Sequence, residues 1–415
     1  MPGPLAGIRV ADFTWVWAGP TCTLQLAHMG AEVIRMESTR RICALRMLPP
    51  WPGGQPNPNA SGYFNQYNQG KRGILLDISK PEGVDIAKKI VAMSDVAAEN
   101  FAGGIINRMG LGYEELRKVK PDIVMISMSG YGQTGPDSGF VSYGPAQVPL
   151  AGLSQLTGYI GSPPMHVGMS YGDPNAGLHA AFAVLSALIY RERTGEGQYI
   201  DMSQWESTMA VLGDGIMNYT MNGEQPPRMG NRAHDMAPHG VFRCAAGEPP
   251  APGLPENERW ISIACGSDEE FQALCGVMER PELADDPRYS TLAVRKANED
   301  ALEAAVEKWT LTQEPFDAMR RLQAAGVAAF PPLMNKELAE DPHLNARRFF
   351  VEKEHAHPEV GVRMHAGIPW RMSGTPCEVW RAAPVMGQDN DYVYGELLGM
   401  STQQIADLVE REVIR

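Results

Sequence analysis

Short β-rich runs alternate with helical patterns along the first third of the chain, and this alternation is the strongest constraint on its fold. The runs IRVADFT, AEVIRME, RGILLDI and DIVMISMSG are typical of buried strands. Helical patterns stand between them, in PTCTLQLAHMG and over residues 81–93. Strands that alternate with helices form a parallel sheet covered by helices. We therefore expect an α/β fold.

The chain is long enough for two domains, because 415 residues exceed the usual span of one hydrophobic core. The helical and strand patterns weaken after Gly213, and a Pro/Gly-rich stretch follows at 245–258. A strand WISIAC and a helix over 268–277 then indicate a compact α+β unit. The segments GVRMHAGIPWRMSG and STQQIADLVEREVI indicate a return to the first domain. We expect a large domain over 1–225, a smaller α+β domain over 226–350 and a return segment over 351–415.

Composition excludes several classes of protein. A hydrophobic fraction of 44% with 20% charged residues is ordinary for a folded, soluble protein. A net charge of −13 argues against nonspecific nucleic-acid binding. The N-terminus resembles no signal peptide and no apolar run approaches a bilayer span, so a cytoplasmic protein without membrane contact is expected. Six cysteines without a C-x-x-C pair indicate reduced thiols rather than a zinc site or a disulfide framework.

Three S-x-x-E/Q patterns predict helix starts through capping boxes, at Ser79, Ser267 and Ser401. A long helix is expected from Pro174 to about Arg193, with its stop at Gly195. The strand QYIDMS and a helix at QWESTMAVLG should follow it.

Asp173, in GDPNAG, stands at the expected start of this long helix. Asp is a favoured N-cap and proline a favoured first helical residue, so capping rules alone favour a structural role. A carboxylate between Gly172 and the open amides of PNAG is also accessible to an acyl group, and those amides stabilise developing negative charge. Both interpretations need the same helix end and are compatible.

The loop TWVWAGP, residues 14–20, follows the first strand, where α/β sheets place their ligand loops. It lacks the G-x-G-x-x-G pattern of dinucleotide-binding proteins. Trp15 and Trp17 either fill a core or line an apolar pocket.

Basic residues form two groups near strands, Arg35 with Arg40 and Arg41, and Lys71 with Arg72. Such groups are usually a solvated face, but in an acidic protein they are also the available partners for a phosphorylated cofactor. The three histidines at 355, 357 and 365 lack a recognised metal-binding spacing, so no metal site is expected. A G-x-S-x-G elbow is also missing, which leaves an α/β-hydrolase triad unsupported.

Taken together, the segments of the chain resemble the family III CoA-transferases, which include formyl-CoA transferase, carnitine CoA-transferase and the benzylsuccinate CoA-transferase subunits. The resemblance follows the family's order over almost the whole chain. It is carried by PLAGIRVADFTWVWAGPTCTLQLAHMGAEVIRME, NQGKRGILLDISKPEG, ENFAGGIINRMGLGYEELRKVKPDIVMISMSGYGQTGP, GDPNAGLHAAFAVLSALIYRERTGEGQYIDMSQWE and LMNKELAEDPH.

The resemblance implies that Asp173 is a covalent nucleophile. In the family, this aspartate attacks the donor thioester and forms a mixed anhydride, then an aspartyl-CoA thioester that the acceptor carboxylate attacks. CoA is thus a substrate, and no tightly bound cofactor or metal is implied. The partners expected are an acyl-CoA donor, such as succinyl-CoA, and a carboxylic acid acceptor.

The resemblance also assigns residues to the CoA channel and implies the family's architecture. That architecture is a Rossmann-like large domain built from both chain ends, a smaller inserted α+β domain, and an interlocked dimer of identical or paralogous chains. The residues implied to contact CoA are Ala18, Arg35, Arg40, Arg41, Lys71, Arg72, Asn100, Phe101, Arg108, Met109 and Tyr143.

Two sequence differences from formyl-CoA transferase affect the prediction of the acid that this chain uses. Trp17 stands where that enzyme has a glutamine, and the glycine-rich run that covers its small oxalyl group is not found here. A bulky aromatic in place of an amide reshapes the acyl pocket, so oxalate and formate are poor candidates. Trp17 with Met165, Met169 and Tyr171 suggests a larger, partly apolar acid, such as an aryl- or alkyl-substituted dicarboxylate. Benzylsuccinate is one specific candidate.

Two alternatives are weighed against a transferase. The α-methylacyl-CoA racemase branch needs a His-Asp pair in the segment here written SYGPAQVPLAGL, which contains no histidine. Without that pair the α-proton is not exchanged in both directions. A noncatalytic CoA-binding subunit that supports a paralogous partner is the second alternative, and the presence of Asp173 speaks against it.

Overall fold

The computed structural model describes residues 3–247 and 257–415, so part of the expected Pro/Gly-rich loop at 245–258 lies outside the described residues. The chain divides into two compact units. The first comprises Met1–Gln155, Met165–Gln225 and Pro342–Arg415, and the second comprises Leu156–Pro164 and Pro226–Asp341. The small domain expected from sequence also began at 226, but it ended at 350 and did not include Leu156–Pro164.

A six-stranded parallel sheet forms the centre of the first unit, as the alternation of strands and helices predicts. Its strand order, β3-β2-β1-β4-β5-β6, reverses between β1 and β4, and the loops that follow these two strands stand where open sheets bind ligands. Sequence analysis did not anticipate β4. The strands are β1 (Arg9–Asp12), β2 (Glu32–Glu37), β3 (Arg72–Leu75), β4 (Val96–Glu99), β5 (Val124–Ser129) and β6 (Gln198–Ser203).

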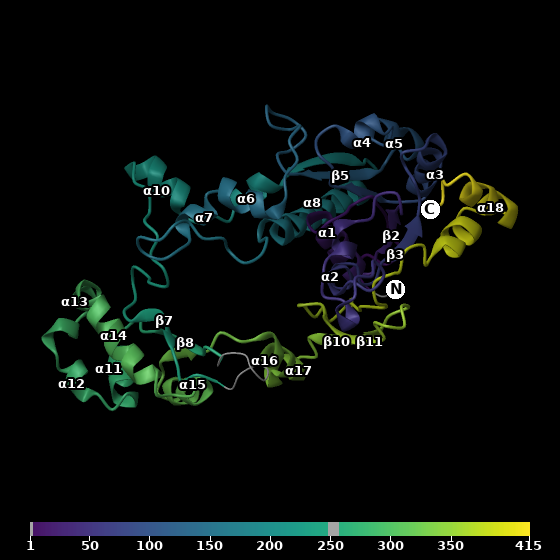
Figure 1. Ribbon diagram of the computed structural model, residues 1–415. Helices are drawn as coiled ribbons and strands as arrows, with labels where there is room; N and C mark the ends of the chain where they lie inside the picture. The colour runs from purple at the N-terminus through teal and green to yellow at the C-terminus, as the bar shows by residue number, and fades with distance from the viewer. Residues whose placement is uncertain (1–2, 248–256) are drawn as a thin grey trace. The chain divides into compact units, whose positions relative to one another are not determined.

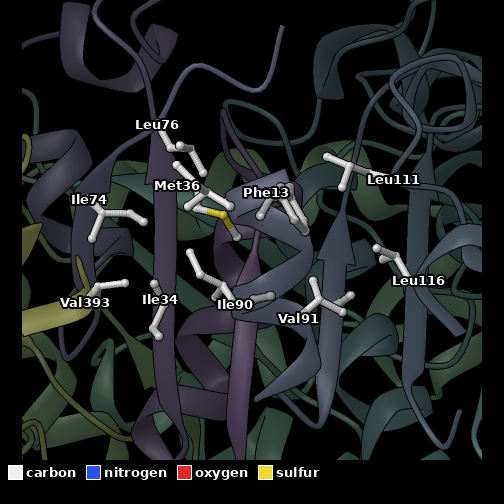
Figure 2. Close-up of a cluster of buried hydrophobic side chains, with 14 of the residues drawn as sticks. Phe13, Ile34, Met36, Ile74, Leu76, Ile90, Val91, Leu111, Leu116 and Val393 are labelled. Atoms are coloured by element: carbon white, nitrogen blue, oxygen red, sulfur yellow. The ribbon is translucent and has the colours of Figure 1, made fainter. Parts of the chain in front are cut away.

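Helices cover both faces of this sheet, because successive strand residues point to opposite faces. Val10, Val33 and Val124 belong to a core shared with helices α1 and α8. The neighbouring Ala11, Ile34 and Met125 belong to a core on the opposite face, together with residues of α3, α5 and α18. Figure 2 shows part of this core, including Ile34, Ile90 and Leu116. Strands β1, β2, β4 and β5 are therefore buried on both faces, which is the pattern of a doubly wound fold.

The helices of the first unit differ in length, and α8 is the longest that the structure describes, with 23 residues. It packs against α1 (Figure 1) and ends at Gly195, whose left-handed conformation terminates the helix as predicted. Over the described residues no helix is both long and apolar enough to cross a membrane. The principal helices are α1 (Ala18–His28), α2 (Gly62–Tyr67), α3 (Pro81–Ala92), α4 (Ile105–Arg108), α5 (Tyr113–Val119), α6 (Gly144–Leu150), α8 (Gly172–Thr194), α9 (Gln204–Met209), α10 (Gly215–Asn222), α17 (Pro342–Ala346) and α18 (Thr402–Glu410).

The predicted capping boxes have different outcomes. Those of Ser267 and Ser401 are present. In each, the serine hydroxyl accepts from the backbone N–H of the third helical residue, and the Glu or Gln side chain of that residue accepts from the serine backbone N–H. The one at Ser79 is wrong. Helix α3 begins one residue later, after Lys80, and the Ser79 hydroxyl donates to Asp77 at 2.6 Å instead.

The C-terminal part of the chain contacts the β3 side of the same sheet. The Tyr394 hydroxyl, on the π-helix η4 (Asp391–Leu397), donates to the Leu75 carbonyl at 2.5 Å. The backbone of Asp77 donates to the Val413 carbonyl. The same part of the chain contains an antiparallel hairpin of β10 (Phe350–Glu354) and β11 (Val362–Ala366).

The second unit contains a three-stranded antiparallel sheet of β7 (His239–Arg243), β8 (Trp260–Ala264) and β9 (Ala328–Phe330). Ile261 and Ile263 of β8 pack against Phe271 and Leu274 of α11 to form its core. Helix α11 covers the range expected from sequence. The helices are α11 (Asp268–Val277), α12 (Pro281–Ala284), α13 (Leu292–Ala297), α14 (Glu299–Thr310), α15 (Pro315–Ala324) and α16 (Asn335–Glu340).

Candidate active site

Asp173 lies in the first turn of α8 and is only 7% exposed. It is not the N-cap, as capping rules alone favoured. The helix begins one residue earlier, at Gly172, and Tyr171 before it already has helical dihedral angles. The Asp173 side chain is therefore not used to cap its own helix and is available for contacts elsewhere.

Two backbone amides hold the Asp173 carboxylate. One belongs to Ala18, the first residue of α1, and the other to Gly144, the first residue of α6. Amides at the first position of a helix have no partner within the helix, so they are available for an acceptor, and the helix dipole adds to their attraction for an anion. A Cβ atom at position 144 would stand 1.9 Å from Oδ2 of Asp173. Only glycine permits this approach.

Burial raises the pKa of Asp173 to about 6, and the hydrogen bonds from Gly144 and Ala18 oppose the rise. No Lys, Arg or His among the described residues forms an ion pair with it. The group is therefore mostly a carboxylate at neutral pH, poorly solvated and without a cationic partner. Such a perturbed, buried carboxylate in a cavity is a candidate nucleophile.

A cavity of about 190 Å³ contains Asp173. Tyr143, expected from sequence, lines it together with Gly130 and Gln204. The loop after β1 forms part of the wall. Asn100 fixes this loop, since its side chain accepts from the Trp15 amide at 2.9 Å and donates to the Trp15 carbonyl at 2.8 Å.

A second cavity, of about 480 Å³, follows the carboxyl ends of β1, β2 and β3 and shares part of its wall with the first. The shared residues include Trp15, Arg41 and Phe101. The Arg41 guanidinium lies 4.4 Å from the centre of the Trp15 ring, which is close enough for a cation–π contact. The Trp15 and Phe101 rings are 5.8 Å apart. We call this second cavity the β1–β3 cleft.

Several residues expected to contact CoA line the β1–β3 cleft: Arg35, Arg40, Arg41, Phe101 and Met109. Arg40 and Arg41 are exposed there, and an Arg40–Ser79 hydrogen bond of 2.8 Å crosses the cleft. Arg35 differs, because its buried guanidinium pairs with Glu37. Arg108 lines a neighbouring cavity of about 470 Å³ to which Met109 also belongs.

Lys71 and Arg72 have other partners. Lys71 is fully buried, and its ammonium donates to Thr23, Asn68 and the Pro20 carbonyl at 2.8–3.0 Å. Arg72 pairs with Glu32 and Asp389, at 2.8 and 3.3 Å. Neither residue lines a cavity described here. We therefore correct the expectation that these two cations meet the cofactor, because both are already paired within the protein.

The four residues expected at the acyl group do not come together. Trp17 packs between Tyr63 and Tyr67, with ring centres 5.3 and 5.2 Å away. Met169 lines a third cavity, of about 680 Å³, to which Tyr63 also belongs. Met165 and Tyr171 are exposed and line none of the cavities described here.

Sequence analysis missed two residues of the site, Gly144 and Tyr63. Gly144 contributes only a backbone amide and the space left by a missing side chain. The one available signal was the proline that follows it, a residue typical of a first helical turn. Tyr63 comes from α2, and no motif marked it.

Three histidines of the C-terminal part are His355, His357 and His365, and the first of them has a perturbed pKa. Burial lowers the pKa of His355 to about 4, and the neighbouring His357 contributes to the shift. Among residues 3–247 and 257–415 no group of three or more His, Cys, Asp or Glu side chains is placed to hold a metal ion.

Comparisons with known proteins identify the family of this chain. Residues 5–390 match the family model "CoA-transferase family III". Succinyl-CoA–D-citramalate CoA-transferase of Chloroflexus aurantiacus is 33% identical, covering 100% of this chain and 98% of that protein. Succinate–glutarate CoA-transferase of Agrobacterium fabrum is 33% identical over 95% and 96%. Acetyl-CoA:oxalate CoA-transferase of Acetobacter aceti is 36% identical over 90% of both chains.

A solved structure shares the fold. The crystal structure of a CAIB/BAIF family protein from Brucella suis superposes with a TM-score of 0.85 and 31% identity, covering 96% of this chain and 100% of that one. The family match spans both units of the chain rather than a single motif. The chain therefore belongs to family III of the CoA-transferases and exchanges CoA between acyl-CoAs and carboxylic acids.

Proposed function

We propose that the chain moves CoA from succinyl-CoA to a second dicarboxylic acid, with Asp173 as the covalent nucleophile. The observation that carries the proposal is the Asp173 carboxylate itself. It is buried, it lacks a cationic partner, and two helix-terminal amides aim it into a cavity that shares a wall with the β1–β3 cleft. A structural carboxylate at this depth would ordinarily be paired.

The reaction has four steps. A carboxylate oxygen of Asp173 attacks the donor thioester carbonyl, and the C–S bond breaks to give a mixed anhydride and CoA thiolate. The thiolate attacks the aspartyl carbonyl, which forms an aspartyl-CoA thioester and releases the donor acid. The acceptor carboxylate attacks that thioester, giving a second anhydride and thiolate. The thiolate finally attacks the acceptor's acyl carbonyl and regenerates the Asp173 carboxylate. Each step exchanges one acyl bond for another without net proton transfer.

The protein assists these steps by orientation and by its backbone dipoles. The amides of Ala18 and Gly144 fix the orientation of the carboxylate for attack on the incoming carbonyl. Burial removes water that would compete for the aspartyl anhydride.

We place CoA in the β1–β3 cleft. Arg40 and Arg41 are exposed cations there and suit the phosphate groups of the nucleotide, since arginine pairs bidentately with phosphate. Phe101 and Met109 supply apolar surface, and Asn100 holds the Trp15 loop at the turn toward Asp173. This placement leads the thiol past Trp15 to the carboxylate.

We propose a dicarboxylic acid as acceptor. The relatives named above act on D-citramalate and glutarate, and another, from Haloarcula hispanica, is a succinyl-CoA:mesaconate CoA-transferase with 31% identity. Aromatic side chains around Trp17 and the cavity beside Tyr63 leave apolar surface for a substituent. Benzylsuccinate is the larger acid to test beside the four- and five-carbon acids.

We also propose that the working enzyme is a dimer of interlocked chains with the second unit as its inserted domain. Leu178, Phe182 and Ile189 follow a helical spacing on α8 and are exposed, Phe182 by 73%. An apolar helix face of this kind requires a partner surface. A paralogous partner is the alternative to a second copy. The cytoplasm is the proposed compartment, since all six cysteines are free thiols.

The racemase alternative is weaker. The residues that line the cavity around Asp173 include no histidine to serve as the partner acid or base. Deuterium incorporation from solvent at the α-carbon of an acyl-CoA, without any acceptor acid, would support it instead.

The test of the proposal is to incubate the protein with succinyl-CoA and a panel of acids, trap with hydroxylamine or borohydride, and locate the modification by mass spectrometry. We expect the modification at Asp173, and we expect Asp173→Ala to lose both transfer and trapping. Asp214→Asn, an exposed aspartate before α10, is the matched control. Full transfer by Asp173→Ala would overturn the mechanism.

A further inference from the structure

The third cavity, of about 680 Å³, lies in the first unit, and its polar side chains have no role so far. Its walls are mainly apolar, from the proline-rich segment before α2, from α2 itself and from the region of β11. We call it the β11 cavity. It is lined by Leu48, Pro49, Pro50, Trp51, Pro52, Ala60, Gly62, Tyr63, Asn65, Gln66, Met169, Val360, Arg363, Met364 and His365.

Two nitrogen-bearing side chains of β11 line this mainly apolar cavity. Arg363 is exposed, and its guanidinium donates to the carbonyl of the adjacent Val362 at 2.8 Å. His365 is only 6% exposed, yet its Nε2 has no hydrogen-bond partner. Residues two apart on a strand point to the same face, so both side chains lie on one face of the hairpin. A buried, unpartnered polar atom usually indicates a missing ligand or water.

A second cation stands beside Arg363. Lys353 of β10 is paired with Arg363 directly across the antiparallel hairpin. Over residues 3–247 and 257–415 neither side chain forms an ion pair. Like charges in directly opposed positions destabilise a hairpin, and an anion bound between or beside them would offset that cost.

Tyr63 and Met169 relate the β11 cavity to Asp173. The Tyr63 hydroxyl lies 3.9 Å from the Met169 sulfur, and both residues line the cavity. Met169 precedes Asp173 by four residues. Burial raises the pKa of Tyr63, and the charges of Tyr67 and Asp173 add to the rise, so Tyr63 lies within electrostatic reach of the carboxylate. The β11 cavity therefore combines apolar side chains, of which Tyr63 is within electrostatic reach of Asp173, with the Arg363 guanidinium.

We propose that the β11 cavity binds the distal carboxylate of a dicarboxylic acyl group, with Arg363 as its partner and Tyr63 and Met169 against its hydrocarbon chain. The inference rests on the proposed function and deepens it, because it names the residue that distinguishes dicarboxylic from monocarboxylic acids. A planar guanidinium binds a carboxylate bidentately, and partial enclosure strengthens the pair. Lys353 adds positive potential without contacting the acid.

Arginine binds phosphate by the same geometry, so the phosphates of CoA are the second source of a matching anion. The experiment must therefore separate acid binding from CoA binding. Glutarate and pentanoate have five carbons each and differ in one carboxylate, which makes them a matched pair of probes.

The test compares Arg363→Gln with the wild type, using butyryl-CoA as donor so that only the acceptor carries a distal carboxylate. We expect the KM for glutarate to rise about 10- to 100-fold and the KM for pentanoate to stay within about twofold. Arg363→Lys should restore part of the difference, because the charge remains. Arg320→Gln is the matched control, since Arg320 is an exposed arginine of α15 in the second unit. Thermal unfolding verifies that each variant folds.

A second measurement needs no turnover. Isothermal titration of glutarate, pentanoate and free CoA into wild type and Arg363→Gln tests the anion site even if the chain transfers CoA to neither acid. Tighter wild-type binding of glutarate than of pentanoate, lost in the variant, supports the inference. Equal binding of the two acids, or an equal loss for both, overturns it. Weaker binding of CoA with unchanged binding of glutarate also overturns it and assigns the cation to a phosphate.

Discussion

Asp12 and Asp173 are both buried carboxylates close to the same loop, but their surroundings are opposite. Asp12 is 0% exposed and accepts from the Thr14 amide at 2.8 Å, the Thr14 hydroxyl at 2.6 Å and the Thr23 hydroxyl at 2.8 Å. The Lys71 ammonium stands 3.5 Å away. Asp173 receives two backbone amides and no cation among the described residues.

The difference separates a structural carboxylate from a reactive one. Asp12 is neutralised by Lys71 and saturated by hydroxyls, so it holds the loop after β1 in place. Asp173 keeps a carboxylate that is exposed to a cavity and costly to ionise, which is a common property of catalytic groups. The two are connected, since the Lys71 ammonium also binds the Pro20 carbonyl in the first turn of α1, the helix that carries the Ala18 amide. The following predictions test this contrast.

Of the changes predicted here, Asp173→Asn should produce the largest, and only the activity should fall. We expect a loss of about 1,000-fold or more in kcat, because an amide is a very poor nucleophile. Stability at pH 7 should stay level or rise, since the raised pKa indicates an ionisation cost of up to about 3 kcal/mol in the folded state that the amide avoids. Steady-state rates and urea unfolding measure the two effects. A stability loss above about 1 kcal/mol would mean that Asp173 is structural.

Lys71→Met should have the opposite profile, with stability changed most. Removing one partner of a buried pair leaves Asp12 uncompensated, and the free energy of unfolding should fall by about 3–5 kcal/mol. The double variant Asp12→Asn with Lys71→Met should lose less than Lys71→Met alone, because no uncompensated charge remains. Urea unfolding of the three proteins measures this. Additive losses would contradict the assigned pairing.

Gly144→Ala should lower kcat by about 10- to 100-fold, because the new Cβ displaces the Asp173 carboxylate from its amides. Overpacking should also cost about 1–3 kcal/mol of stability. Gly139→Ala is the matched control, since a Cβ there meets no atom within 4 Å. Equal kinetics of the two variants would mean that the close approach at Gly144 has no catalytic role.

The pH dependence should give the smallest effect. Because only the carboxylate attacks, kcat/KM should fall about tenfold per pH unit below pH about 6. Stability should change in the other direction. The pKa of Asp173 is raised in the folded state above its ordinary value of 3.8, so the folded state binds the proton more tightly. Its contribution to stability is therefore largest below pH about 4 and is lost as the pH rises to about 6.

That stability change can be isolated by subtracting the pH profile of Asp173→Asn from that of the wild type. A kcat/KM profile that stays flat down to pH 4 would contradict the raised pKa of Asp173.

The sheet could largely be predicted from sequence, because parallel strands are buried on both faces and read as continuous apolar runs. Strand β4 was missed for a physical reason. Its four residues, Val96–Glu99, include two alanines, which have little β-propensity, and its place between β1 and β5 depends on contacts far along the chain. The capping box at Ser79 failed similarly, because Asp77 competes locally for its hydroxyl.

The site was only half predictable. The Gly-Asp-Pro sequence placed Asp173 near a helix start, but the amides that hold it come from residues 18 and 144, which no local pattern connects. The basic residues illustrate the same limit. Arg35 lies within β2 and is buried against Glu37, whereas Arg41 follows the strand and reaches the cleft, although both looked alike in sequence. Whether such an arginine is buried or reaches a cleft depends on contacts with residues far along the chain, which a local sequence pattern does not contain.

The stacked pair Trp15 and Arg41 forms a wall common to the β1–β3 cleft and the cavity of Asp173, while the β1–β3 cleft and the β11 cavity have no lining residue in common. On the assignments proposed, thiol and acids thus reach the aspartate by different routes. The donor acid is released and the acceptor acid binds while the same CoA molecule remains bound. Isotope exchange between a free acid and its thioester should then proceed without mixing the bound CoA with the pool in solution.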